Sequence, residues 1–259
     1  KGYGSADGLI PDSSNSPMEQ MLLRSGNQSD VIKLVQNYKP LGVYIFHGDA
    51  DRTVSVNYAR QMRDLLGKFH PDFSYYQYRG GSHWFGNESV AWPPLFEYFK
   101  WHSLKADSAV DKIDFVTANP AVSSSFRWAS IVQQTEHLDF SEIKLTRDKK
   151  AKTLTGSTKN VAMLKLDVRQ FNEGDNLSIS VDSILIKYVV SNEDELYLHR
   201  TGSGWVMGSK PDTRHKNPMR SGTFKEAFHH RMVFVYGTSG NPPEDKWAYN
   251  KARYDAEVW

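Results

Sequence analysis

The order of hydrophobic and polar residues predicts alternating helices and strands over the first hundred positions. Residues 16–26 begin with Ser-Pro and end with Gly, the residue types that start and stop a helix. A second helix is expected over 27–39, because its apolar residues lie on one side and Pro40 ends it. The near-continuous apolar run 41–46 follows, and such a run between a helix and a turn predicts a strand buried on both faces of a parallel sheet.

Two further helices and one strand are predicted before residue 105. Residues 56–69 place Ala59, Met62, Leu65 and Leu66 on one helical face. Residues 73–78 form an aromatic strand pattern, and residues 93–102 begin a helix with two prolines. The order helix, strand, helix, strand, helix predicts an α/β fold class for 1–105.

After about residue 105 the pattern changes to short runs of β type, several of which alternate between apolar and polar positions. Turn residues separate the runs, as at Asn119-Pro120, and Lys149–Lys152 has the composition of a solvated hairpin tip. We therefore predict a compact antiparallel, sandwich-like β-rich domain over 106–215. The expected strands lie within 113–117, 125–133, 140–146, 160–168, 177–190 and 195–200.

The last section, 216–259, predicts an apolar strand at 232–236, a glycine-containing turn and a helix that runs to Trp259. We interpret it as a strand–helix segment at the start of a further, truncated unit. The chain begins at Lys1 in a glycine-rich loop and ends inside a predicted helix. We therefore expect a piece of a longer polypeptide, in which 1–105 is accompanied by a missing N-terminal part of its own sheet.

Composition excludes several classes of function. Thirty-two basic and thirty acidic residues give a net charge of +2, which does not suggest a nucleic-acid or membrane surface. No apolar run is as long as a membrane span, roughly 18–20 residues. The absence of cysteine excludes disulfides, cysteine-ligated zinc and a thiol nucleophile. The compartment stays open, with a slight preference for the periplasm or secretion, and no cofactor or metal is expected.

Polar residues follow both predicted strands of the first part. The turn His47–Val54 comes directly after the first strand and contains Asp51, and the loop Arg79–Gly86 comes after the second and contains His83. In open α/β sheets, functional groups lie where loops leave the carboxyl ends of parallel strands, so an Asp and a His from these loops can meet. Such a pair can activate a hydroxyl nucleophile, because the Asp orients the imidazole that takes the proton.

The spacing His47-Gly48-x-x-Asp51-x-x-Val54, followed by Gly81-x-His83, resembles the acid and base loops of α/β-hydrolases. Among these it is most similar to the prolyl oligopeptidase family and its dienelactone-hydrolase-like relatives, over roughly residues 10–103. The resemblance implies that 1–105 is the C-terminal portion of an α/β-hydrolase sheet. It further implies that Asp51 is the catalytic acid and that His83 is the base.

The sequence departs from this family at the nucleophile. In α/β-hydrolases a Gly-x-Ser-x-Gly motif between a strand and a helix precedes the acid and the base, and no such motif occurs in the chain. Ser5 has no strand before it and is not nominated. The resemblance implies that the serine and the oxyanion hole lie upstream, so this chain alone is expected to be inactive.

The functional hypothesis is therefore a fragment of a serine hydrolase, a prolyl-oligopeptidase-type peptidase that acts on a peptide or ester substrate. One alternative is an esterase for carbohydrate or other esters with the same triad. A second alternative is a non-catalytic binding or assembly module whose β-domain recognises a glycan or a protein. Trp128, Trp205 and the tyrosines of that domain are candidates for a sugar-stacking face, although a place in the core is the simpler explanation for them.

Simpler roles are expected for the remaining candidate residues. Asp49 is expected to brace its loop or cap the following helix, and His47 to make a structural hydrogen bond. Gly237–Gly240 matches an anion-binding helix start less well than an ordinary turn between a strand and a helix. The remaining histidines that could suggest a metal site lack the spacing of ligands and are expected to be solvated; they are His199, His215, His229 and His230.

Overall fold

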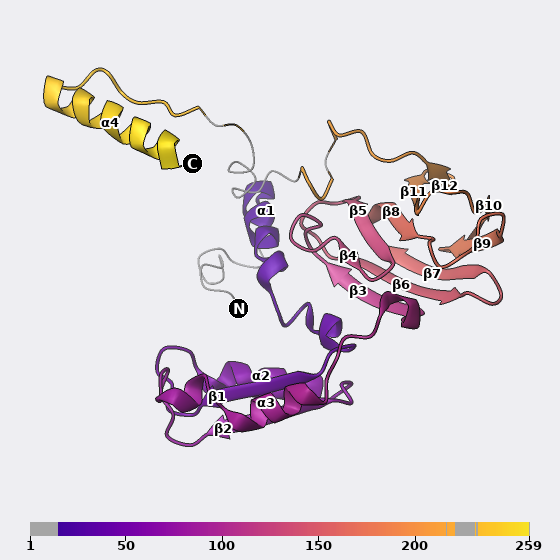
Figure 1. Ribbon diagram of the computed structural model, residues 1–259, viewed down its shortest axis with the longest axis horizontal. Coiled ribbons are helices and arrows are strands. Elements are labelled where there is room, and N and C mark those ends of the chain that lie inside the picture. The colour runs from indigo at the N-terminus through magenta and orange to yellow at the C-terminus, as the bar shows by residue number, and fades with distance from the viewer. Residues whose placement is uncertain (1–14, 216, 221–230, 232, 259) are drawn as a thin grey trace. The chain divides into compact units, whose positions relative to one another are not determined.

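The computed structural model describes residues 15–215, 217–220, 231 and 233–258. The chain divides into two compact units, Lys1–Pro218 and Met219–Trp259 (Figure 1). Ser5, His229, His230 and Met232 lie outside the described residues. In the described ranges, no helix has the length and apolar character needed to cross a membrane.

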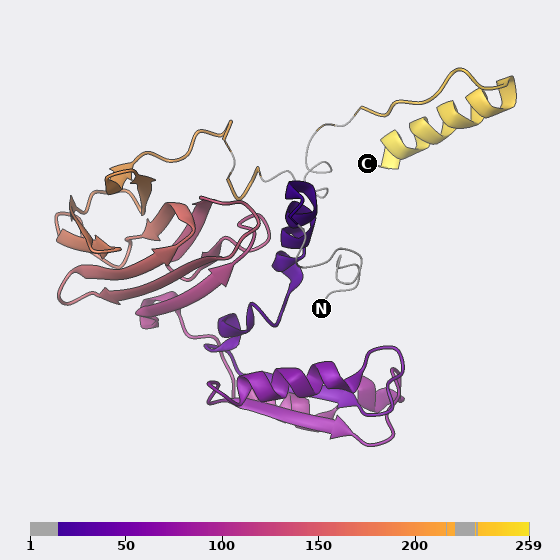
Figure 2. The same cartoon turned by 180° about the vertical axis from the view of Figure 1, so that it is seen from behind.

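The first part of the larger unit contains the predicted alternation of helices and strands. Two parallel strands pair in register from Val43↔Phe73 to Gly48↔Tyr78. Helix α2 lies on one face of this pair and α3 on the other, as the two opposite views show (Figures 1 and 2). Five of the predicted elements are confirmed: α1 Pro17–Ser25, β1 Val43–Gly48, α2 Val56–Leu66, β2 Phe73–Tyr78 and α3 Pro93–Lys100.

Aromatic side chains pack on the face of the β1–β2 pair that α3 covers. Phe46 of β1 stacks on Trp92 with ring centroids 4.9 Å apart, and the Trp92 indole N–H donates to the Tyr44 hydroxyl at 2.9 Å. The prediction that β1 is buried on both faces is wrong, because five of its six residues are only half-buried. Among the described residues this sheet has two strands, so β1 is hydrogen-bonded at one edge only.

The second predicted helix, over 27–39, is also wrong. The segment forms two 3₁₀ turns, Asn27–Ser29 and Val35–Tyr38. Asp30 starts a helical turn, since its Oδ1 accepts the Ile32 and Lys33 amides at 3.1 and 3.2 Å. The turn does not propagate, because the chain then bonds across three residues and the Asn37 side chain binds the backbone of Val116.

The rest of the larger unit is β-rich, as predicted, and consists of two five-stranded sheets (Figure 1). Two short 3₁₀ turns, Asn87–Ser89 and Asp107–Ala109, precede the sheets in sequence. One sheet has the order β10 Ile184–Val189, β9 Asn176–Val181, β7 Thr153–Lys159, β6 Ser141–Asp148 and β3 Lys112–Thr117. The other has the order β12 Gly204–Gly208, β11 Glu195–Thr201, β8 Val161–Asp167, β5 Ala129–Gln134 and β4 Ser125–Phe126.

The sheets are not wholly antiparallel, which corrects the prediction. Strands β7 and β9 pair in parallel. The strand between them in sequence, β8, lies in the opposite sheet, and Asn160, with a φ of 53°, forms the corner from β7 into β8. The chain therefore returns to the first sheet in the direction of β7. The Asn160 side chain fixes this corner by bonding the backbone N and O of Glu136 at 2.7 and 2.9 Å.

The hydrophobic core lies between the two sheets. Buried residues alternate with more exposed ones along β6 and β9, and Ile143, Leu164 and Leu198 are fully buried. Trp128 and Trp205 are also buried, at 2% and 3% exposure. They are core aromatics, so they offer no face for stacking a sugar.

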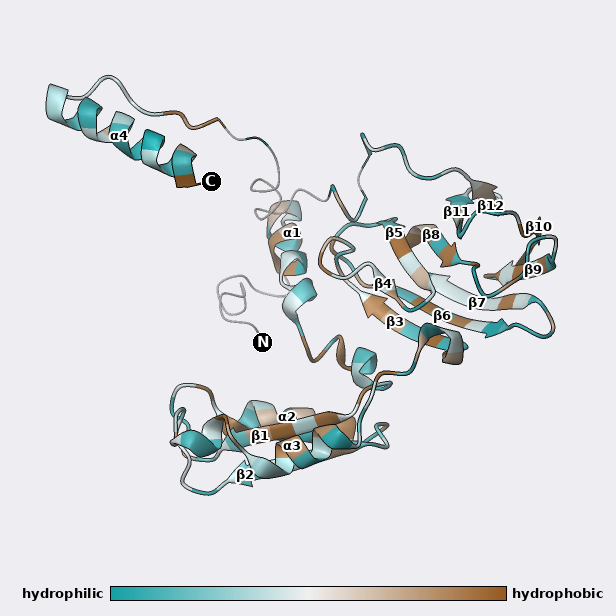
Figure 3. Ribbon diagram, in the orientation of Figure 1, coloured by the Kyte–Doolittle hydropathy of each residue, from teal (hydrophilic) through white to brown (hydrophobic). Residues whose placement is uncertain are grey.

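The smaller unit contains the predicted C-terminal helix, α4 Pro242–Val258, which is largely hydrophilic and has no buried residue (Figure 3). The strand predicted at 232–236 is wrong where it is described, since 233–236 is irregular. An apolar run becomes a strand only when a neighbour accepts its backbone hydrogen bonds. None of the described residues pairs with this one.

Candidate active site

The two loops singled out in the sequence leave the same edge of the β1–β2 pair. They are bonded to each other, since the Asp49 amide donates to the Tyr78 carbonyl at 3.0 Å and the Ala50 amide to the Gly81 carbonyl at 2.9 Å. A Cβ atom at Gly48 would lie 2.3 Å from the Gly81 oxygen. Glycine at position 48 is therefore what permits this close approach of the loops.

Asp51 lies in a turn that holds its carboxylate in place. Oδ1 accepts the amides of Thr53 and Val54, each at 2.8 Å, and Oδ2 lies 3.0 Å from Nδ1 of His83. Burial acts to raise the pKa of Asp51, but the hydrogen bonds from Val54, His83 and Thr53 outweigh it and lower the pKa to about 2. Asp51 is therefore ionised at neutral pH.

His83 faces Asp51 through one ring nitrogen and leaves the other free. An ionised carboxylate only accepts hydrogen bonds, so Nδ1 of His83 carries the proton in this pair. Among the described residues, Nε2 has no hydrogen-bond partner, and the side chain is 44% exposed. In its neutral form, His83 would therefore present an unprotonated Nε2 to a substrate or a nucleophile, which is the arrangement that a general base requires.

Asp49 has a different environment. Its Oδ1 accepts the Gly80 amide at 2.6 Å, and its Oδ2 accepts from Nε2 of Gln77 at 3.3 Å. The prediction that Asp49 braces the loop is confirmed. Helix capping falls instead to Ser55, whose hydroxyl accepts the Asn57 amide at 3.3 Å.

The same unit holds a second His–Asp pair, which the sequence reasoning missed. Nε2 of His102 lies 2.9 Å from Oδ2 of Asp72, and Nδ1 lies 2.6 Å from the Tyr98 carbonyl. Both ring nitrogens are therefore occupied, in contrast to those of His83. The two residues are thirty positions apart and belong to no motif, so the sequence carries no signal for this pair. It is suited to holding α3 near the start of β2, and not to moving a proton.

Comparisons with protein-family models, curated proteins and solved structures give no match. The similarity of the two loops to those of α/β-hydrolases therefore stays a prediction, and the functional interpretation rests on the residues of this chain. The observation that bears most on it is the geometry of Asp51 and His83.

The described part of the chain contains no cluster of three or more histidine and acidic side chains that would suit a metal ion. His199 is bonded instead to a backbone carbonyl, with Nε2 2.9 Å from the Ser209 oxygen.

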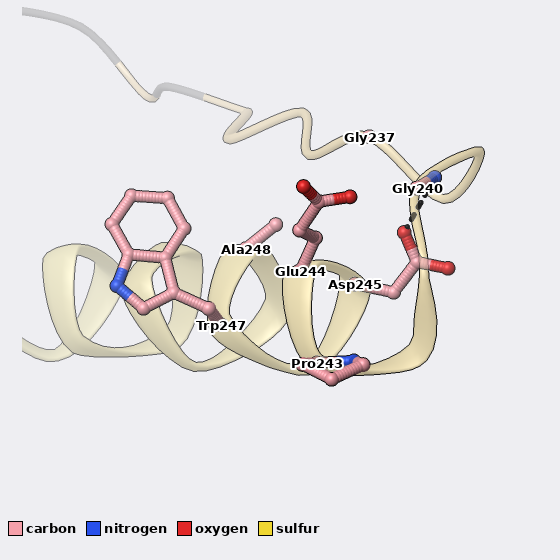
Figure 4. Close-up of a pocket in the computed structure, with 7 residues that line it drawn as sticks. All are labelled: Gly237, Gly240, Pro243, Glu244, Asp245, Trp247 and Ala248. Atoms are coloured by element: carbon pink, nitrogen blue, oxygen red, sulfur yellow. Dashed lines mark hydrogen bonds between the residues drawn. The ribbon is translucent and has the colours of Figure 1, made fainter.

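The turn before α4 is filled by the chain's own carboxylates (Figure 4). The Gly240 amide donates to Asp245 Oδ1 and the Asn241 amide donates to Glu244 Oε2, both at 3.0 Å. A second anion would meet these two negative charges at the helix start, so the anion-binding alternative has no support.

Proposed function

We propose that Asp51 and His83 are the acid and the base of a serine-hydrolase triad in an α/β-hydrolase of the prolyl oligopeptidase type. The observation that carries the proposal is the 3.0 Å contact between an ionised, anchored Asp51 and Nδ1 of His83, together with the free Nε2 of that histidine. The order of the two loops along the chain and their place at the carboxyl ends of parallel strands support it.

In the proposed reaction, Nε2 of His83 takes the proton of a serine hydroxyl as that oxygen attacks the carbonyl carbon of a peptide or ester bond. Asp51 keeps the imidazole in the reactive tautomer and stabilises the imidazolium that forms. His83 then returns the proton to the leaving amine or alcohol, and an acyl-enzyme remains. Water, activated by the same nitrogen, hydrolyses the acyl-enzyme and frees the serine.

The serine is proposed to come from a segment other than the described residues, since none of their hydroxyl groups is bonded to His83. We propose that further strands of the same polypeptide carry it and pair with the open edge of β1. An unpaired edge and exposed aromatic side chains favour such a neighbour. Phe96, Phe99 and Trp101 are 50%, 56% and 85% exposed.

Labelling with a fluorophosphonate probe tests the proposal in the full-length polypeptide that carries this chain. The wild type should be labelled, and His83→Ala should abolish labelling because no other group activates the serine. His102→Gln is the matched control, since it alters the other His–Asp pair of the unit, and it should be labelled like the wild type. Labelling of His83→Ala at the wild-type rate would refute the assignment.

Substrate profiling of the same sample separates a peptidase from an esterase. The proposal expects cleavage of a peptide amide bond, and turnover of esters alone would move the assignment to the esterase alternative. Trp128 and Trp205 do not support the binding-module alternative, because both are buried in the core of the β-domain and cannot stack on a sugar.

A further inference from the structure

A second histidine, His47, lies beside the Asp51 carboxylate. It is the penultimate residue of β1, and its side chain is 19% exposed. Nε2 of His47 lies 3.0 Å from the Val54 carbonyl and 3.5 Å from Oδ2 of Asp51. A carbonyl oxygen only accepts hydrogen bonds, so Nε2 must carry a proton that points toward this carbonyl and the neighbouring carboxylate.

His47 ties the end of the Asp51 turn to a fixed element. The turn is otherwise held by the carboxylate itself, since Oδ1 of Asp51 bonds the amides of Thr53 and Val54. His47 stands in the β1–β2 register opposite Gln77, so its backbone is fixed independently of the turn. Because His47 is fixed in β1, its bond to the Val54 carbonyl also fixes Val54, whose amide bonds the Asp51 carboxylate.

We propose that His47 is a positioning residue of the site, which holds Asp51 toward His83 through the Val54 carbonyl. The inference rests on the proposed function of Asp51 and His83. His47 touches neither a substrate nor the free nitrogen of His83, so it acts only through Asp51. A strut of this kind matters because small displacements of a catalytic group lower the rate strongly, by up to about 10²-fold for roughly 1 Å.

The pKa of the Asp51 carboxyl depends on the bond between His47 and Val54, and ¹³C NMR of the 259-residue chain can measure this pKa by titration. In the wild type the carboxyl should stay ionised down to about pH 3, since its pKa is about 2. His47→Phe keeps the ring shape but removes the donor to the Val54 carbonyl. The Val54 amide then bonds Asp51 less firmly, so the Asp51 pKa should rise toward 3.8. His47→Gln restores an N–H donor and should return the titration to the wild-type range.

The matched control is His199→Phe, which removes a similar bond between Nε2 of this β11 histidine and the Ser209 carbonyl and should leave Asp51 unchanged. An unchanged Asp51 titration in a folded His47→Phe chain would overturn the proposal, and so would a His47→Gln variant that behaves like the Phe variant. Should His47→Phe fail to fold, ¹⁵N NMR of the wild type decides. A proton on Nε2 of His47 is expected there, and a proton on Nδ1 alone would overturn the inference.

This readout is independent of catalysis. In the full-length polypeptide, His47→Phe should lower kcat by up to about 10²-fold while KM changes little. A failure of His83→Ala to abolish probe labelling would refute the proposed function, whereas the Asp51 titration tests His47 alone.

Discussion

At the scale of single residues, the neighbours of each histidine determine where its protons lie. His70 accepts the Asp72 amide at Nδ1, so it is a neutral ring that donates from Nε2 to the Tyr38 carbonyl. His102 faces acceptors at both nitrogens, and only an imidazolium satisfies both bonds. His83 faces one acceptor and keeps one nitrogen free. These three histidines of the α/β part therefore have three different hydrogen-bonding patterns.

His102 should make stability depend on pH. The Tyr98 carbonyl and Asp72 raise the pKa of His102 above its ordinary value of 6.5, against the opposing effect of burial. The stabilisation is thus fully present below about pH 6.5 and is lost as the pH rises through the higher, folded-state pKa. Urea unfolding from pH 5 to 9 should show this loss in the wild type and not in His102→Gln. An identical pH profile for the two proteins would contradict it.

The order and spacing of the loops were enough to predict the meeting of Asp51 with His83, because parallel strands bring successive loops to one edge. The structural hydrogen bond expected of His47 is confirmed, but its partner and the pairing of His102 were not predictable in the same way. Their partners, the Val54 carbonyl and Asp72, depend on side-chain directions and on where α3 packs. A pattern of residue types along the chain does not encode such directions.

At the scale of elements, Asp182 joins the two sheets of the β-domain. It lies in the turn between β9 and β10, and its carboxylate accepts from the Thr158 amide and hydroxyl, both at 2.7 Å. From the opposite sheet, Arg200 and the Trp205 indole each donate to it at 2.8 Å. These bonds lower the pKa of Asp182 although burial acts to raise it.

Asp182→Ala should lower the free energy of unfolding by about 3 kcal/mol, because it leaves charged and buried donors without an acceptor. Asp182→Asn keeps the turn, whose φ of 50° asparagine tolerates, and should lose less. Urea denaturation at neutral pH measures both. Equal stability of the Ala variant and the wild type would show that the carboxylate does not hold the sheets together.

The apolar and polar pattern predicted most elements but not their pairing. The run 160–168 forms one strand, β8, as predicted, but its pattern did not show that Asn160 is the corner between two sheets. Strand β7 was missed because residues 153–159 are mostly small and polar and include Gly156. Residues 153–159 form a strand because β6 and β9 pair with them on either side, so tertiary contacts and not local sequence preference determine this element.

At the scale of the whole molecule, side chains before β1 are bonded to the β-domain. Asn37 pairs with the backbone N and O of Val116 in the edge strand β3, at 2.9 and 2.8 Å. Asn27 donates to the Leu138 carbonyl at 3.0 Å. Residues 27–37 therefore satisfy backbone groups of the sandwich in addition to leading into β1.

We accordingly predict that residues 1–105 do not fold as an isolated fragment. The fragment would keep a sheet of two described strands, which is marginal in water, and would lose the contacts to the β-domain. Its ¹H–¹⁵N NMR spectrum should show the narrow dispersion of an unfolded chain. A well-dispersed spectrum would contradict this prediction and would show that the α/β part is self-sufficient.

The central claim is that Asp51, and not Asp49, supports His83 as the base. The rate at which a fluorophosphonate probe phosphonylates the serine, measured in the full-length polypeptide for Asp51→Asn and Asp49→Asn, tests it most directly. Asp51→Asn should lower the rate by about 10⁴-fold, because an amide favours the wrong tautomer of His83. Asp49→Asn should have a much smaller effect, since Asp49 only braces the loop. A larger loss for Asp49→Asn than for Asp51→Asn would contradict the account.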